Sequence, residues 1–449
     1  MKPKYLEKIL MFTVAFFYTF YRVINAYLTI PFWDNYDSPA YFKLEFFPSF
    51  RPHGVTLIFA LLKNESVISI FHAVIGSLVW IYLWIVIWQI LKSKIVKILF
   101  SFFYFILASS AIILEHDSSI LSESLAISST VFLLASALNV YLKTEEDNRV
   151  SLSIFGFAIL WFASTKSSNS LLLPILVGLF MLRLIKFKNK FFISIAIGIV
   201  TLFGTFIIVN TFSTNTTQSL NTSATINNRI INVERWKKDL INSGYPKNAI
   251  NTWEEFSKNN LGIPPDQAVV NLPEFKQWWL GGGDKFLVRF IFRNPDYGIY
   301  APIAIPLISQ EFSFRDTLLS GWSQGTDLIQ EHNGFSRSLL TRTFFWPDEP
   351  EKAYLCLALS FFLIGLSLLI FSFRKSFDFF NLFFTIFLLT IIWSYFNWWF
   401  GSKPTDMARH NLSAAVVIKL LSTISIFFAM EKKTYFKKYD KVKNHGSLS

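Results

Sequence analysis

The sequence predicts an all-α polytopic membrane protein with about ten transmembrane helices and one large extracytoplasmic loop domain. Its 449 residues are 52% apolar and only 16% charged, whereas soluble domains carry about 25% charged residues. Apolar runs of about 20 residues, the length that crosses a bilayer, recur along the chain. The Lys and Arg residues of the short connections fall mostly on one side of the predicted bilayer, as the positive-inside rule requires.

Composition also excludes several classes of protein. The high apolar content excludes a disordered chain, and the single cysteine, Cys356, excludes a disulfide scaffold and a Cys-based zinc or iron–sulfur site. The formal net charge of +12 is compatible with nucleic-acid binding, but basic cytoplasmic loops account for most of it. We therefore expect no nucleic-acid partner.

Ten segments qualify, or nearly qualify, as membrane spans. They are Ile9–Ile30, Val67–Leu91, Ile95–Leu114, Ile120–Leu142, Leu152–Ser164, Leu171–Ile185, Phe191–Phe212, Tyr354–Phe373, Phe379–Phe400 and Asn411–Met430. The fifth and sixth are short and meet at the polar run Ser164–Ser170. They form either two full spans or a re-entrant pair, and we favour two spans.

The positive charges place the N-terminus inside, and ten spans return the C-terminus to the same side. The first apolar run is too long for a signal peptide and lacks a small-residue cleavage site. The bias toward Asn, Lys, Phe and Ile is typical of an AT-rich bacterial genome. We therefore expect a multi-pass protein of the bacterial cytoplasmic (inner) membrane with both termini cytoplasmic.

Four regions follow from this topology. Residues 1–212 form a transmembrane module with its first outer loop at 31–66, and residues 213–353 form the extracytoplasmic loop domain. Residues 354–430 supply the last three transmembrane helices, and residues 431–449 form a basic cytoplasmic tail.

The two outer regions contain their own predicted elements. The apolar stretch Gly54–Leu62 is too short to span and indicates a helix at the membrane surface. In the large loop, Thr211–Asn228 is rich in Thr, Ser and Asn and indicates a linker, while Glu234–Asn242 and Asn251–Asn259 are typical of helices. Asp284–Phe292 has an amphipathic pattern suited to the lipid headgroup layer.

The first candidate site is an acidic run directly after the first span. Asp34 and Asp37 lie three residues apart in a segment that is expected at the outer membrane surface. A carboxylate there can act as a general base toward a hydroxyl, because partial burial raises its pKa, and two carboxylates can hold a divalent cation. The alternative is a solvated turn, since Asn, Asp, Ser and Pro are turn formers.

The second candidate site opens the fourth predicted span. If that helix begins near Asp117, Ser119 and Glu123 lie one turn apart on one face, with His116 a further turn back. A carboxylate such as Glu123 inside a span usually faces the bundle interior or a wet cavity. Two alternatives stay open: Asp117 or Ser118 caps the helix, and Glu123 pairs with Arg22 or another cation in a structural role.

The third candidate site is a set of cations on the expected outer side. Lys166 lies in the turn between the fifth and sixth spans, Arg409 and His410 open the last span, and Arg51 lies just before the short surface helix of the first outer loop. Cations on that side run against the positive-inside bias, and a phosphate at the membrane surface is one reason for them. The alternative is contact with the phosphates of surrounding lipids.

This arrangement resembles the GT-C superfamily of integral-membrane glycosyltransferases. The likeness covers most of the chain as architecture, and its motifs are short. They are the acidic run Asp34–Tyr41, its continuation through Phe50–Pro52, the Ser-Glu-Ser-Leu run Ser122–Leu125, the Lys-bearing turn at Lys166, Ala408–Asn411, and the loop piece Phe286–Tyr297. The motifs of the dinucleotide, P-loop, zincin and α/β-hydrolase families are absent from the sequence.

The resemblance implies transfer of a sugar from a polyprenyl-phosphate carrier to a hydroxyl acceptor on the outer face, with inversion. The acceptor class is an envelope glycan, a lipid or a protein. Asp34 or Asp37 would then take the proton from the acceptor hydroxyl. The Asp-x-x-Asp spacing departs from members with adjacent acidic residues. It leaves open which Asp is catalytic and whether a divalent cation, Mg or Mn, is needed, and no cofactor is certain.

The same resemblance assigns substrate-binding roles to the other candidates. Arg51, Lys166 and Arg409 would neutralise the leaving lipid phosphate. Glu123 and His116 would orient the donor or help to hold a metal, and His410 belongs to the same substrate-binding group.

Two other functions remain open. An O-antigen polymerase or ligase has a similar number of spans and one large outer loop, but it would depend on arginines of that loop and would not need the Asp pair. A non-enzymatic transporter of lipid-linked sugars predicts two related halves and charges near the midplane of the bilayer, and neither is evident in the sequence.

Overall fold

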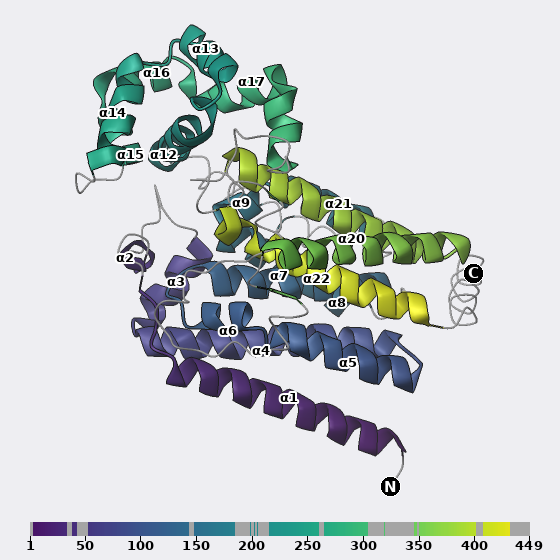
Figure 1. Ribbon diagram of the computed structural model, residues 1–449. Coiled ribbons are helices and arrows are strands. Elements are labelled where there is room, and N and C mark those ends of the chain that lie inside the picture. The colour runs from purple at the N-terminus through teal and green to yellow at the C-terminus, as the bar shows by residue number, and fades with distance from the viewer. Residues whose placement is uncertain are drawn as a thin grey trace.

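The structure is a computed structural model. It describes residues 3–33, 38–42, 53–142, 148–184, 198, 202, 204, 215–259, 265–303, 318, 345–347, 350–400 and 407–431. The regular secondary structure of these residues is helical, apart from one isolated parallel bridge between Phe32 and Ser119. Long helices lie side by side in one bundle, and a group of shorter helices, α12 to α17, lies beside one end of it (Figure 1). The predicted all-α class is confirmed.

The bundle consists of long helices that run from one of its ends to the other, together with shorter helices between them. They are α1 (Pro3–Leu28), α4 (Glu65–Ile90), α5 (Lys94–Ala108), α6 (Ala111–Asp117), α7 (Glu123–Leu142), α8 (Asn148–Thr165), α10 (Leu173–Leu184), α20 (Pro350–Phe373), α21 (Phe377–Phe400) and α22 (Met407–Met430). We call the end at which α7 and α22 begin the polar end of the bundle, because the buried charges described below gather there.

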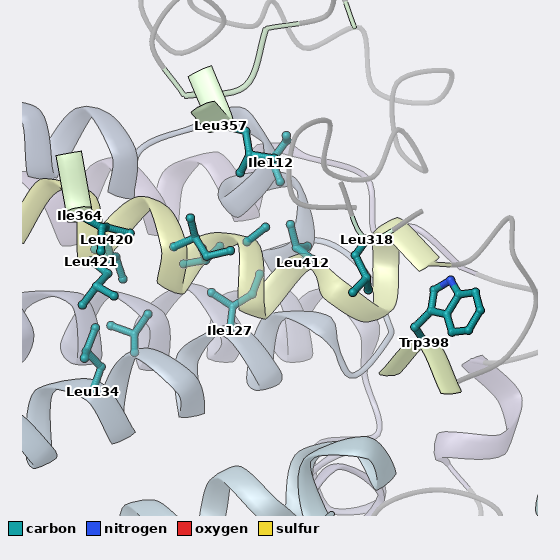
Figure 2. Packing of buried hydrophobic residues seen from close by; sticks show 14 of the residues in the cluster. Ile112, Ile127, Leu134, Leu318, Leu357, Ile364, Trp398, Leu412, Leu420 and Leu421 are labelled. Atoms are coloured by element: carbon teal, nitrogen blue, oxygen red, sulfur yellow. The ribbon is translucent and has the colours of Figure 1, made fainter. Parts of the chain in front are cut away.

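The centre of the bundle is α22, which is almost wholly buried, as an apolar helix surrounded by other helices should be. Its Leu412, Leu420 and Leu421 belong to one core cluster with Ile127 of α7 and Leu357 of α20 (Figure 2). By contrast, α1 exposes most of its apolar surface. That surface is what a peripheral helix presents to lipid.

Six of the described helices are long and apolar enough to cross a membrane: α1, α4, α7, α20, α21 and α22. A seventh candidate is the pair α5 and α6, which together cover the third predicted span but bend by 51°. The apolar helices α8 and α10 are shorter, and most of the predicted seventh span, Phe191–Phe212, lies outside the described residues. A multi-pass membrane protein fits these helices, and the number of ten spans stays a prediction.

The fourth predicted span begins later than expected. The helix α7 starts at Glu123, because the residues before it pair with the segment that follows α1. Phe32 N donates to Ser118 O (2.8 Å), and Ile120 N donates to Phe32 O (2.9 Å). The prediction that His116, Ser119 and Glu123 share one helix is therefore wrong, since His116 belongs to α6.

Three short helices complete the polar end: α2 (Ser38–Tyr41), α3 (His53–Leu62) and α9 (Ser167–Ser170). The helix expected at Gly54–Leu62 is confirmed by α3, which packs against α8. A Cβ atom on Gly54 would lie only 2.5 Å from Ser164 Oγ. Glycine at this position therefore sets how closely α3 approaches α8.

The shorter helices form what we call the loop domain. They are α12 (Asn215–Thr225), η2 (Ile226–Ile230), α13 (Glu234–Asn242), α14 (Lys247–Asn259), α15 (Pro265–Asn271), α16 (Pro273–Leu280), η3 (Gly283–Lys285), α17 (Phe286–Arg293), η4 (Asp296–Tyr300) and η5 (Ala301–Ile303). Their buried aromatic side chains, among them Trp236, Phe275, Phe290 and Tyr297, make T-shaped, tilted and stacked contacts.

The expected linker at Thr211–Asn228 is wrong for the residues from 215 onward, which are helical. The reason is that polar side chains there become buried hydrogen-bonding groups. Asn227 Nδ2 donates to Ser223 O (2.8 Å) and to the hydroxyl of Tyr245 (3.1 Å). The Thr, Ser and Asn content favoured a linker. The segment is helical because its polar side chains are bonded and packed against Tyr245.

Hydrogen bonds from the last turns of α21 join the loop domain to the bundle. Tyr395 Oη donates to Ile299 O (3.0 Å), and Trp399 Nε1 donates to Gly298 O (2.8 Å). The buried Arg229 donates to Trp398 O (2.5 Å), and its guanidinium lies 4.5 Å from the centre of the Trp398 ring. The loop domain is therefore fixed to the polar end of the bundle.

Candidate functional site

A buried ionic cluster lies at the polar end of the bundle, and we call its members Glu123, Lys166 and Arg409 the ionic cluster. The Glu123 Oε1 atom accepts from Arg409 Nε at 2.8 Å and lies 3.3 Å from Lys166 Nζ. Lys166 Nζ also donates to Arg409 O (3.2 Å). The side chains of all three residues are at least nine-tenths buried. The structure thus brings together three site residues predicted from distant parts of the chain.

Local structure explains how these residues meet. Glu123 is the first residue of α7, Lys166 is the N-cap of α9, and Arg409 lies in the first turn of α22. The N-terminal ends of three helices therefore converge on one point. A helix N-terminus carries a partial positive charge, which suits the Glu123 carboxylate but disfavours cations. The two cations are held at this place by their contacts with Glu123.

Among its three members, the ionic cluster holds two cations and one carboxylate, and Lys166 and Arg409 have further interactions outside it. The second carboxylate oxygen, Glu123 Oε2, is buried and accepts no hydrogen bond from any described residue. The cluster is therefore suited to bind an anion, and a phosphate oxygen matches the donors that Lys and Arg provide.

His116 lies beside this cluster although it comes from a different helix than expected. It is buried near the end of α6, close enough to Glu123, Lys166 and Arg409 to interact with their charges. Its neighbour Glu115 is also buried and is a further carboxylate at this end, which the sequence analysis did not single out. His410 accepts a hydrogen bond through its backbone oxygen from Asn397 Nδ2 (3.2 Å).

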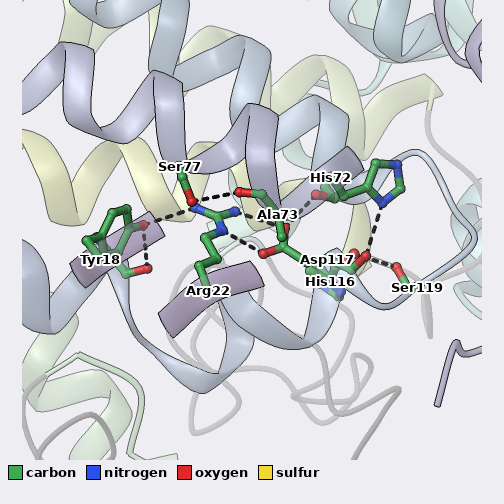
Figure 3. Close-up of polar contacts among 10 residues, drawn as sticks. Tyr18, Arg22, His72, Ala73, Ser77, His116, Asp117 and Ser119 are labelled. Carbon is green, nitrogen blue, oxygen red and sulfur yellow. Dashed lines mark hydrogen bonds and ion pairs between the residues drawn. The ribbon is translucent and has the colours of Figure 1, made fainter. Parts of the chain in front are cut away.

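A second buried ion pair lies next to the ionic cluster and joins α1 to α6. Arg22 donates to both carboxylate oxygens of Asp117, from Nε at 2.6 Å and from Nη2 at 2.9 Å (Figure 3). Asp117 also accepts from Ser124 Oγ at 2.8 Å, and Tyr18 Oη accepts from Arg22 at 3.0 Å. This pair is electrically balanced and held in a bidentate geometry, so we assign it a structural role.

The Arg22–Asp117 pair resolves the alternatives left open by the sequence. Arg22 pairs with Asp117, and Glu123 pairs with Lys166 and Arg409. Asp117 is the last residue of α6 and does not cap α7. Sequence reasoning missed this pairing, although a single Arg inside an apolar span is itself a signal that a buried carboxylate lies nearby.

The most important predicted residues lie outside the described part of the chain. Asp34, Asp37 and Arg51 fall in the ranges 34–37 and 43–52, for which the structure gives no placement. The residues on either side of the acidic pair are described, and both sides contact the segment that precedes Glu123. The bridge joins Phe32 to Ser119, and Ser38 Oγ donates to Ile120 O (2.9 Å).

The described residues contain no group of three or more His, Cys, Asp or Glu side chains that could hold a metal ion. The predicted ligands for a divalent cation, Asp34 and Asp37, are not among those residues. The need for Mg or Mn therefore stays a prediction that the geometry does not test.

Lys419 is a buried cation that the sequence analysis did not select. It lies ten residues after Arg409 on α22, about 15 Å further along the helix axis. Its side chain is buried, and its ammonium group lies 4.1 Å from the centre of the Trp346 ring. A Lys inside a predicted span is unusual, and that alone could have marked it.

Comparisons with known proteins give no relative: no family model matches the chain, and no curated protein and no solved structure matches it either.

Proposed function

We propose that this protein is a membrane glycosyltransferase, which moves a sugar from a polyprenyl-phosphate carrier to a hydroxyl acceptor at the polar end of the bundle. The single observation that carries the proposal is the ionic cluster, in which two buried cations share one carboxylate at three converging helix N-termini. Such a place favours an anion at the depth where a lipid phosphate meets water.

In this proposal, Lys166 and Arg409 bind the phosphate that leaves with the carrier lipid. The donor is a phosphodiester with one negative charge, and the leaving phosphate gains a second charge as its bond to the sugar breaks, so fixed cations stabilise the transition state more strongly than the singly charged ground state. Glu123 bonds both cations and holds them in place, so it acts as a positioning residue. His116 lies beside this group and, with His410, the residue after Arg409 in α22, orients the donor, and Arg51 adds a third cation.

The acid pair supplies the general base. Asp34 or Asp37 takes the proton of the acceptor hydroxyl as its oxygen bonds to the anomeric carbon. The bond from that carbon to the phosphate oxygen breaks at the same time, which inverts the configuration and releases the carrier phosphate. The contacts of Phe32 and Ser38 with the segment before Glu123 support a base close to the ionic cluster. None of these steps uses a bound metal ion.

The proposal includes the predicted setting of the protein. Ten spans cross the cytoplasmic membrane of a bacterium, both termini are cytoplasmic, and the loop domain faces outward over the site. The acceptor is an envelope glycan, a lipid or a protein. This topology keeps the carrier lipid in the bilayer while its phosphate and sugar reach the aqueous side.

The test is sugar transfer by purified protein in lipid discs that contain a panel of polyprenyl-phosphate sugars, with mass analysis of the products. We expect one donor to lose its sugar to an acceptor, and the activity to be lost in Asp34→Asn or Asp37→Asn. The matched control is Asp378→Asn, because Asp378 is exposed at the opposite end of the bundle. Normal turnover in both variants would refute the assigned base and favour a polymerase or ligase.

A transporter gives a different result in the same discs. It moves the lipid-linked sugar between leaflets without cleaving it, so no donor in the panel would lose its sugar.

A further inference from the structure

The loop domain exposes an apolar surface that its own fold does not cover. Phe286, Leu287 and Phe290 form the buried face of α17, yet the other face carries Phe292, which is 84% exposed. Ile299 of η4 is 63% exposed. Val288 of α17 and Tyr300 of η4 add to this exposed apolar set, and Ile303 of the following η5 is exposed as well. Bulky apolar residues gathered on a domain surface mark a binding surface.

A basic stripe runs beside this apolar surface. Lys285, Arg289 and Arg293 are spaced four residues apart, so they lie along one side of the helix, and all three are exposed. None of the three forms an ion pair with a described residue. Arg289 and Arg293 also line a cleft of about 200 Å³ together with Trp278 and Gly282. These side chains are available to negatively charged groups.

The position of this surface relative to the bundle identifies its partner. Gly298 and Ile299 accept hydrogen bonds from Trp399 and Tyr395, which lie in the last two turns of α21. This helix is one of the six that can cross a membrane, so its last turns mark the level at which the bilayer ends. Figure 1 shows α17 next to this end of α21, and the two helices are in contact.

We propose that α17 and η4 form a lipid-binding surface. It docks on the leaflet that lies on the same side of the membrane as the loop domain. Phe292 and Ile299 insert among the acyl chains, and the basic stripe contacts the phosphates of anionic headgroups. An apolar strip beside a basic strip is the pattern of helices that lie in the membrane interface. The bilayer is the expected occupant because the surface is continuous with a helix that enters it. The loop domain is then held at two places, by α21 and by lipid.

The single cysteine makes the test direct. Cys356→Ser gives a cysteine-free background, into which Phe292→Cys or, as the control, Lys258→Cys is introduced for nitroxide labelling. Lys258 is exposed on α14, which lies on the opposite side of the loop domain from α17 (Figure 1). In discs of phosphatidylethanolamine and phosphatidylglycerol, the accessibility of each label to oxygen and to a water-soluble nickel complex is measured.

We expect the label at position 292 to collide with oxygen and to be protected from nickel, and the label at 258 to show the reverse. Equal exposure of both labels to nickel would overturn the proposal. Dipolar broadening of the spectrum of the label at 292 would also overturn the proposal. It would show that two labels lie close together, so that a second copy of the chain covers this surface. If the Phe292→Cys protein does not fold, Ile299→Cys carries the same test.

The basic stripe has its own experiment. Arg289→Glu combined with Arg293→Glu should increase the nickel accessibility of the label at 292 severalfold in anionic discs, and Lys237→Glu with Lys238→Glu on α13 should leave it unchanged. Inorganic phosphate added to the labelled protein that keeps Arg289 and Arg293 should not alter the nickel accessibility of the label at 292, since the site requires headgroups held in a bilayer. An unchanged label in the α17 variant would refute the role of the stripe.

Discussion

At the scale of single residues, Glu123 is the group on which the polar end depends. Its carboxylate bonds the guanidinium of Arg409 and lies within ion-pair distance of the ammonium of Lys166, and all three side chains are buried. Removing one partner of a buried ionic group costs more than the group contributes when it is intact, because the remaining charges lose their compensation. Substitution of Glu123 should therefore destabilise the protein far more than substitution of an exposed carboxylate.

Glu123→Gln should lower the free energy of unfolding by about 3–5 kcal/mol, since two buried cations lose the carboxylate that they share. The measurement is thermal or denaturant unfolding in detergent. The control is Glu254→Gln, because Glu254 forms an exposed i,i+4 pair with Lys258, and such pairs contribute less than about 1 kcal/mol. Equal effects of the two substitutions would contradict the view that Glu123 compensates buried charge.

Gly76 sets the path of the Arg22 side chain. A Cβ atom at this position would lie 2.2 Å from Arg22 Nη2, so Gly76→Ala should displace the guanidinium from Asp117. We expect a loss of about 1–3 kcal/mol in unfolding free energy from this overpacking. The control is Gly178→Ala on α10, where nothing lies within 4 Å of the new methyl group. Two equally stable variants would show that Arg22 has room to move.

At the scale of elements, the sequence predicts most of the helices but not all of their ends. The length of continuous apolar runs identified the helices that can span, and the short helix at residues 54–62 followed from its length. The break before Glu123 could not be predicted, because it depends on pairing with Phe32, which lies almost ninety residues earlier. The helix at 215–230 was missed since its polar residues are satisfied by a distant tyrosine.

The candidate site, like the helices, was only partly predictable from the sequence. Residue type and expected depth selected Glu123, Lys166 and Arg409, and the structure joins them. The pairing of Arg22 with Asp117 required knowledge of which helices are neighbours. For Asp34, Asp37 and Arg51, which lie outside the described residues, the sequence prediction stays untested by geometry.

The contact between η2 and α21 leads to a prediction about how firmly the loop domain is attached to the bundle. Arg229 donates to the backbone of Trp398 and lies over its ring, in a buried position. Arg229→Gln should lose the cation–π contact and weaken the attachment of η2 to α21. We expect faster amide hydrogen exchange in residues 226–230. Arg235→Gln is the control, because Arg235 is exposed. Unchanged exchange in Arg229→Gln would show that other contacts fix the loop domain.

At the scale of the whole molecule, the account depends on where the charge lies. The bundle is apolar along most of its length, and most of its described buried ionic groups gather where the loop domain is attached, apart from Lys419 within α22 and Glu431 just after that helix. In the proposed function, this layout would place cations at the depth of lipid phosphates while the carrier chain stays in the bilayer. The proposed lipid contact of α17 adds a second attachment for the loop domain beside that site.

The measurement that tests this account most directly is the affinity of the purified protein for polyprenyl phosphate without a sugar. Lys166→Met and Arg409→Gln should each weaken binding about tenfold or more, since a hydrogen bond to a charged group contributes about 1.5–3 kcal/mol. Lys97→Met, which removes a cation at the opposite end of the bundle, should leave the affinity unchanged. Equal affinity in all of these proteins would contradict the claim that the ionic cluster holds the phosphate of the carrier.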